Sequence, residues 1–228
     1  MGDFTGFADT DARFFQRLAK HQDRAWFQAH KTEYEEGWST PMKALLGDVR
    51  SIIDSCYERC DLDEPKVFRI FRDVRFSKDK APYKTHVAGI LSVARSAKVT
   101  ETPAALYFHV GTEVIAAAGL YRMDGPSLVR YRDAVVDERH GSELEAILKR
   151  LKRAGFETDS MSEETLKKVP RGFDPEHPRA ALLKKKGLGV TFSDFPMGLL
   201  TSPKLVGWLA DRAKKATSLV EWLTVVTS

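Results

Sequence analysis

Three runs in the middle of the chain constrain the fold most strongly. Residues 87–93, 104–110 and 114–120 are rich in β-branched and aromatic side chains, which favour strands. A Gly-Thr pair at 111–112 provides a tight turn between the last two runs. Strands that follow one another through so short a turn pair antiparallel, and this argues against a doubly wound parallel sheet.

Helical patterns flank these strands on both sides. Asp23 is a capping residue for one helix, and Pro41 stands at the first position of the next, where its missing N–H is tolerated. The expected helices cover residues 10–20, 23–38, 40–60, 128–151 (interrupted near His140-Gly141), 176–186 and 203–226, and short strands are expected at 156–158 and 188–192. We therefore predict a single α+β domain over residues 1–228, with a mostly antiparallel sheet flanked by helices.

Within that domain, the N-terminal helices occupy about residues 10–60, a basic motif occupies residues 66–86, and the sheet and later helices occupy residues 87–228. The formal net charge of the chain is only +4, but it is unevenly distributed. Residues 1–65 carry a net charge of −5, whereas residues 66–86 and residues 149–186 each carry +5. Such basic regions attract phosphates, nucleic acid or an acidic protein.

The motif RIFRDVRFSKDKAPYK, residues 69–84, combines dense positive charge with apolar residues. A solvated basic tail would not be expected to contain apolar residues such as Ile70 and Val74. The pattern therefore indicates an anion site that is anchored to the rest of the protein. Asp73 lies beside the arginines whether the segment is a strand or a helix, and a carboxylate fixes the plane of a guanidinium through bidentate bonds. A phosphate-bearing small molecule would fit such a site. The predicted ligand contacts are Arg69, Arg72, Asp73, Arg75, Lys80, Tyr83 and Lys84.

Two alternatives to a ligand site follow from the same residues. In one, the motif arginines form an ion network that stabilises the fold, joins the N-terminal helices to the sheet and belongs to a structural or protein-interaction domain. In the other, the motif and a second basic cluster at residues 167–186 form a groove for nucleic acid. Tyr83 either contacts the ligand or covers the core.

Candidates for proton transfer are few. In the second predicted strand, Tyr107 and His109 face away from Leu106 and Phe108, so His109 could act as an acid or base on the floor of a cleft. Asp73 is the other candidate. Each also has a purely structural interpretation. His109, like His86, can be a half-exposed histidine without a catalytic role, and Asp73 can be an ion-pair partner of the arginines. The sequence thus leaves open whether the protein is an enzyme.

No known cofactor or metal motif is recognisable. The chain has no Walker A loop, dinucleotide glycine fingerprint or nucleophile elbow, and its histidines are scattered. We expect no metal and no cofactor. No apolar run approaches the roughly 20 residues that span a bilayer, and the acidic N-terminus does not resemble a signal peptide, so we expect no membrane association. Cys56 and Cys60, interpreted as reduced thiols, favour the cytoplasm, and the oligomeric state is not indicated.

The basic motif resembles the signature of a known family. Arg-x-x-Arg-Asp-x-Arg-Phe, followed by Asp-Lys and Tyr-Lys, is similar to the pattern of a bacterial and fungal family of uncharacterised proteins, the domain of unknown function 2461. The segments DRAWFQAHKTEYE, LYFHVGTEVIAAAGLY and LKKVPRGFDPEHPRAALLKKKGL resemble further parts of that family. The resemblance covers nearly the whole chain and implies one α+β domain, but it implies no activity.

Overall fold

An antiparallel sheet lies at the centre of the molecule. The computed structural model describes residues 2–75, 77–94, 103–158 and 165–228. Within these residues the strand order is β1-β3-β4-β5-β6, and β2 also pairs with β3. The strands are β1 (Asp61–Leu62), β2 (Lys66–Val67), β3 (His86–Ala94), β4 (Ala105–Gly111), β5 (Val114–Leu120) and β6 (Leu188–Thr191). The predicted α+β fold is thereby confirmed.

Helices cover one face and both ends of this sheet. They are α1 (Arg13–Lys20), α2 (Arg24–Ala29), α3 (Lys31–Tyr34), α4 (Thr40–Ile53), α5 (Gly125–Val136), α6 (Glu138–Arg153), α7 (Ala180–Leu183) and α8 (Lys204–Thr227). A π-helical turn, Glu35–Ser39, connects α3 to α4, and 3₁₀ turns occupy Asp54–Cys56 and Met197–Leu199. None of the described helices is long and apolar enough to cross a membrane.

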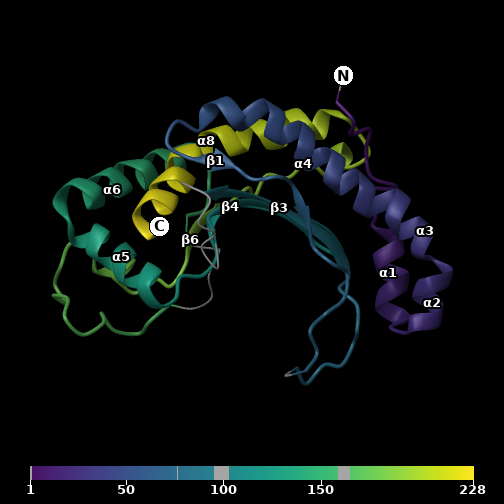
Figure 1. Cartoon of the computed structure of the whole chain (residues 1–228), viewed down its shortest axis with the longest axis horizontal. Helices are drawn as coiled ribbons and strands as arrows, with labels where there is room; N and C mark the ends of the chain where they lie inside the picture. Colours follow the sequence, from purple (N-terminus) through teal and green to yellow (C-terminus); the bar gives the residue numbers. More distant parts are fainter. Residues whose placement is uncertain (1, 76, 95–102, 159–164) are drawn as a thin grey trace.

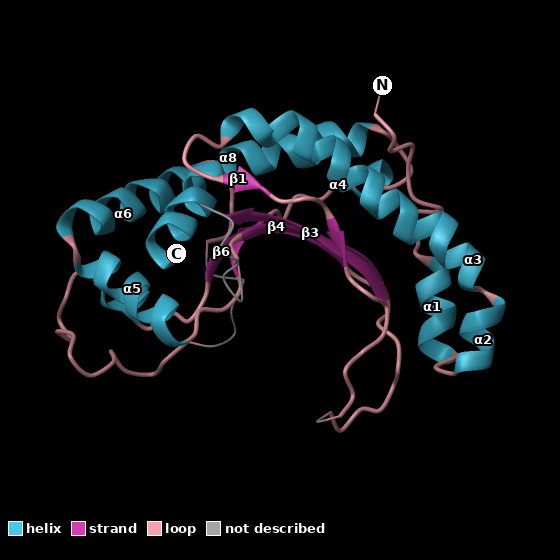
Figure 2. Ribbon diagram, in the orientation of Figure 1, coloured by secondary structure: helices cyan, strands magenta, loops and turns pink. Residues whose placement is uncertain are grey.

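The core lies between the sheet and the two long helices α4 and α8, which pack on β3 and β5. Figure 1 shows these helices along one side of the sheet, with α1–α3 at one end and α5–α6 at the other. Gly89 in β3 lets α4 approach closely, because a Cβ atom there would lie 2.5 Å from the Leu46 side chain. In the ribbon of Figure 2, no described helix runs along the opposite face of β3 and β4.

Side chains alternate along β4 as the sequence predicts. Phe108 is fully buried on the core face, where its ring lies 6.4 Å from that of Phe7. Tyr107 and His109 point to the opposite face, which we call the open face. Antiparallel register places Ala88 beside His109, so His86, two residues earlier in β3, lies on the open face as well.

Several helix predictions need correction. The predicted helix at 40–60 ends at Ile53 and is followed only by a 3₁₀ turn to Cys56. The predicted helix at 128–151 is broken at Asp137 and not at His140-Gly141, because the Asp137 carboxylate accepts the His140 backbone N–H and starts α6 there. The predicted helix at 176–186 is only α7. Pro175 and Pro178 explain why this helix begins late, since the residue before a proline avoids the helical conformation.

Candidate functional site

The basic motif folds as a hairpin-like loop and not as a strand or a helix. Its two arms are tied by the Arg72 N–H donating to the Pro82 carbonyl and by the Lys84 N–H donating to the Ile70 carbonyl, both at 2.8 Å. We call residues 68–84 the basic hairpin; of these, Phe76 lies outside the described residues. Figure 1 shows the hairpin extending away from the helices, on the side of the sheet opposite α4 and α8.

Aromatic packing anchors the hairpin to the N-terminal helices. The Tyr83 ring is buried and stacks on Phe27 of α2 at 4.6 Å, and its backbone N–H donates to Gln22. Phe71 packs against both rings. Tyr83 is thus packed against α2, with little of its ring exposed.

The charges at the tip of the hairpin pair with one another. Arg75 donates to both oxygens of Asp73, at 2.7 and 3.0 Å, and Arg72 pairs with Asp79. The Arg75 guanidinium holds the pKa of the Asp73 carboxyl below its usual range. These pairs are local and exposed, and they do not connect the N-terminal helices to the sheet. The Lys80 ammonium donates to the Val74 carbonyl at 3.0 Å within the same tip.

The charges at the base of the hairpin are arranged differently. Arg69, Lys84 and His86, which we call the base cluster, lie where the hairpin joins the sheet. Among the described residues, no carboxylate forms an ion pair with Arg69 or Lys84. Burial, and then the charge of Arg69, lowers the pKa of Lys84. Burial, and then the charge of Lys84, lowers the pKa of His86, although Glu113 opposes this. The charges of Arg69 and Lys84 thus disfavour one another, and the lowered pKa of His86 favours its neutral imidazole.

The open face of the sheet continues this cluster. The His86 ring stacks on His109 at 4.3 Å, and the Tyr107 hydroxyl is hydrogen-bonded to His109 Nδ1 at 2.8 Å. Burial, and then the charge of His86, lowers the pKa of His109 to about 4, so its imidazole is neutral at pH 7. His109 Nε2 is buried without a hydrogen-bond partner, and the nearest Glu113 oxygen is 3.7 Å away. His109 thus contacts both Tyr107 and His86 on this face.

The sequence singled out both histidines but gave no reason to combine them. Their contact depends on the register between β3 and β4, which places residues 86 and 109 on neighbouring rows of one face. The Lys84 ammonium lies 5.5 Å from the centroid of the Phe68 ring, and that of Lys66 lies 6.0 Å from it. The Phe68 ring thus lies between two lysines, one of which, Lys84, acts on His86.

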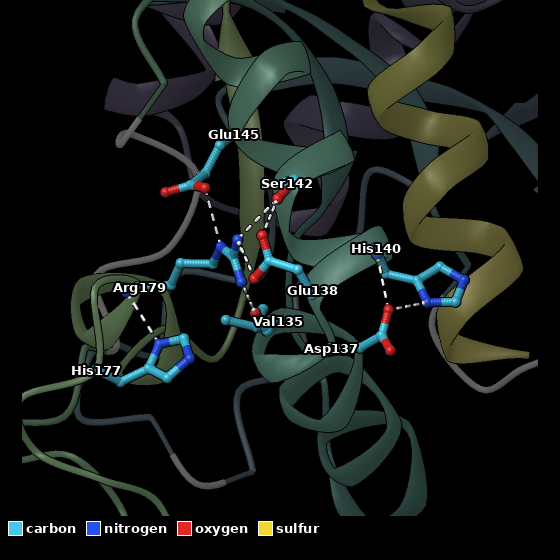
Figure 3. Close-up of polar contacts among 8 residues, drawn as sticks. All are labelled: Val135, Asp137, Glu138, His140, Ser142, Glu145, His177 and Arg179. Atoms are coloured by element: carbon cyan, nitrogen blue, oxygen red, sulfur yellow. Dashed lines mark hydrogen bonds and ion pairs between the residues drawn. The ribbon is translucent and has the colours of Figure 1, made fainter.

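The second basic cluster contains a buried arginine. The Arg179 guanidinium donates to Glu145 at 2.9 Å, to Ser142 at 2.9 Å, to Glu138 at 3.2 Å and to the Val135 carbonyl at 3.4 Å. Figure 3 shows these acceptors, from the end of α5 and the first turns of α6, surrounding it. Arg179 thus attaches the segment before α7 to the α5–α6 pair, and it does not contribute to a surface groove.

Other members of the cluster remain at the surface or bind within the protein. Lys167, Lys168 and Arg171 are exposed, whereas Lys185 and Lys186 are half-buried and have interactions of their own. His177 accepts the Arg179 backbone N–H at 3.0 Å just before α7. No group of three His, Cys, Asp or Glu side chains within the described ranges is arranged to hold a metal ion.

Comparison with known proteins gives a single result. A family model described as "Conserved hypothetical protein (DUF2461)" matches residues 11–222, and this is the family that the basic motif resembles. No curated protein and no solved structure matches the chain.

Proposed function

The chain belongs to the DUF2461 family, and from the charges of the basic hairpin we propose that it binds a phosphate-bearing small molecule at the base cluster. The observation that carries this proposal is the placement of Arg69 and Lys84 beside His86, with the pKa values of Lys84 and His86 lowered by burial and then by neighbouring positive charge. A bound dianion would raise the pKa values of Lys84 and His86 again, because it favours the protonated, charged form of each side chain.

The chemistry of the three side chains suits such an anion. Arg69 presents a planar fork of N–H donors, Lys84 a compact ammonium, and His86 a ring that gains a proton beside negative charge. The tip is less suitable, because Arg72 and Arg75 already pair with carboxylates. Of the predicted ligand contacts, the proposal therefore keeps Arg69 and Lys84 at the base of the motif, and it adds His86.

The proposal concerns binding and includes no reaction. Asp73 is held by Arg75, and His109 is buried, so neither of the predicted proton-transfer residues has a free, exposed group for a substrate. We propose a cytoplasmic location, where the thiols of Cys56 and Cys60 would remain reduced.

Replacing Lys84 by methionine should abolish most of the stabilisation by phosphate. Methionine retains an apolar stem but no charge, so we expect phosphate to bind about 10- to 100-fold more weakly, the loss of one charge-assisted hydrogen bond. The measurement is the melting temperature against increasing inorganic phosphate, repeated with sulfate, because a ligand that binds only the native state raises stability.

The matched control is Lys80→Met, the same change at the tip of the same hairpin. Since Lys80 donates to a carbonyl within the hairpin, this variant should respond to phosphate like the wild type. Equal losses in both variants would indicate diffuse attraction by the whole hairpin. Absence of any phosphate or sulfate shift in the wild type would remove the proposal.

Nucleic-acid binding is a second candidate, favoured by the placement of two basic segments. Figure 1 shows the basic hairpin and the segment before α7 extending on the same side of the sheet, near its opposite ends. Lys167, Lys168 and Arg171 are exposed in the latter. A single strand of DNA or RNA lying along the open face would contact both segments.

Salt dependence separates this candidate from a small ligand. If single strands bind across both segments, fluorescence anisotropy should show affinity falling steeply with salt, with a logarithmic slope of roughly −0.7 per phosphate neutralised. The double variant Lys167→Ala/Lys168→Ala should reduce that slope. No binding of short DNA or RNA at low salt would exclude this candidate and leave the base cluster unaffected.

A further inference from the structure

A hollow of about 320 Å³ lies beside the base cluster. One wall is the arm of the basic hairpin, and the other is formed by α2, α3 and the π-helical turn that follows. Arg69 and Phe68 line it from the hairpin side, and Phe27 and Tyr34 line it from the helices. The hollow therefore shares Arg69 with the base cluster and adds an aromatic environment to it.

Phe71 lines this hollow with a partly exposed aromatic ring. It is 47% exposed, although its ring packs edge-on against Phe27 at 6.1 Å and lies 5.3 Å from Tyr83. An aromatic ring held in place by two others and still open on one side is suited to stacking with a planar ligand. The same contacts keep the ring ordered before a ligand arrives, so stacking would lose little side-chain entropy.

The helical wall supplies polar groups. Lys31 and Glu35 both line the hollow and form an ion pair of 3.2 Å, with each side chain about half exposed. Glu35 stands at the start of the π-helical turn, and its carboxylate can accept hydrogen bonds from ring N–H or amino groups. Lys31 can donate to a ring nitrogen or carbonyl. This combination of an aromatic surface with one acceptor and one donor matches the edge of a nucleobase.

The hollow and the base cluster are adjacent. Phe68 lines the hollow, and the Lys84 ammonium lies 5.5 Å from the centroid of its ring. Arg69 also lines the hollow, and its charge acts on Lys84. A ligand with its ring in the hollow would therefore place a phosphate against Arg69, on the side of Lys84. The volume is at the small end of the range for ligand pockets, roughly 300–1,000 Å³, which suits a single nucleoside better than a longer strand.

We infer that the ligand of the base cluster is a nucleoside phosphate, with its base in the hollow against Phe71 and its phosphate at Arg69 and Lys84. This inference rests on the proposed function and names its ligand class. It assigns Glu35 and Lys31 to the recognition of the base, and the base cluster to the recognition of the phosphate.

Calorimetric titration with three probes tests this assignment: adenosine 5′-monophosphate, guanosine 5′-monophosphate and ribose 5-phosphate. Because stacking and edge contacts are available only to the nucleotides, at least one of them should bind about tenfold more tightly than ribose 5-phosphate. Phe71→Ala should remove that difference and leave ribose 5-phosphate binding unchanged. Phe71→Leu, which keeps apolar packing on Phe27, guards against misfolding of the alanine variant and should give the same result.

Two further variants complete the test. Glu35→Gln should change the preference between the two nucleotides, and Met197→Ala, another side chain that is 47% exposed, should change nothing. If ribose 5-phosphate and both nucleotides bind the wild type equally, the hollow takes no base and the inference fails while the phosphate site stands. If none of the three binds, the proposed function fails and the inference falls with it.

Discussion

Replacing Arg179 by alanine is expected to lower the free energy of unfolding by about 3 kcal/mol, near the lower end of the range for breaking a buried ion pair. The guanidinium is only 7% exposed and bonds with acceptors on α5 and α6, so its loss leaves the Val135 carbonyl unpaired and a void beside Gly141. The loss stays moderate because Glu138 and Glu145 reach solvent and can be hydrated. For a chain of this size the melting temperature should fall by about 6–12 °C.

Two comparisons isolate the role of the guanidinium. Arg179→Lys keeps the charge but cannot reach acceptors in several directions at once, so its melting temperature should lie between those of the wild type and the alanine variant. Arg171→Ala removes an exposed arginine from the same segment and should be nearly neutral. If Arg179→Ala melts at the same temperature as Arg171→Ala, the guanidinium contacts of Arg179 drawn in Figure 3 contribute nothing to stability.

The second large effect is acid sensitivity arising from His109. Its pKa is about 4 in the folded protein and about 6.5 in the unfolded chain. Above pH 6.5 the histidine is neutral in both states and has no effect on stability. As the pH falls from 6.5 to about 4, the unfolded chain takes up a proton that the folded protein does not, so stability falls by as much as about 3 kcal/mol.

The non-titrating variant His109→Asn measures this contribution. Its amide can accept the Tyr107 hydroxyl, so the variant should retain that contact while its free energy of unfolding depends less on pH between 6.5 and 4. Urea unfolding at several pH values gives both curves. If the wild type and the variant lose stability in parallel, His109 does not carry the acid sensitivity.

A related measurement tests the stacking of the two histidines. The charge of His86 is the second cause of the lowered pKa of His109, after burial. His86→Asn should therefore raise the pKa of His109 toward its ordinary value without fully restoring it, and NMR titration of the imidazole reads this directly. An unchanged pKa would mean that burial alone is responsible.

Much of the fold could be predicted from local sequence. Alternation of large apolar residues with Tyr107 and His109 specifies β4, and the short turn after it dictates antiparallel pairing with β5. The long amphipathic segment at the end of the chain becomes α8 with boundaries close to those expected. These predictions succeed because side-chain period and turn chemistry are properties of neighbouring residues. The errors, at Asp137 and before α7, concern breaks where one cap or proline outweighs the periodic pattern.

The candidate site depended on contacts between distant residues. The sequence indicated the basic motif and named Arg69 and Lys84, but it could not separate them from Arg72 and Arg75, because all four have the same kind of local surroundings. Only the tertiary structure, by folding the motif into a hairpin, pairs the tip arginines with carboxylates and leaves Arg69 at the hollow and Lys84 beside the Phe68 ring. Likewise, strand register brings His86 onto His109, and packing against α6 buries Arg179. The sequence by itself determines charge and composition. Which partner each charged side chain contacts depends on where the chain reverses direction and on which surfaces become buried.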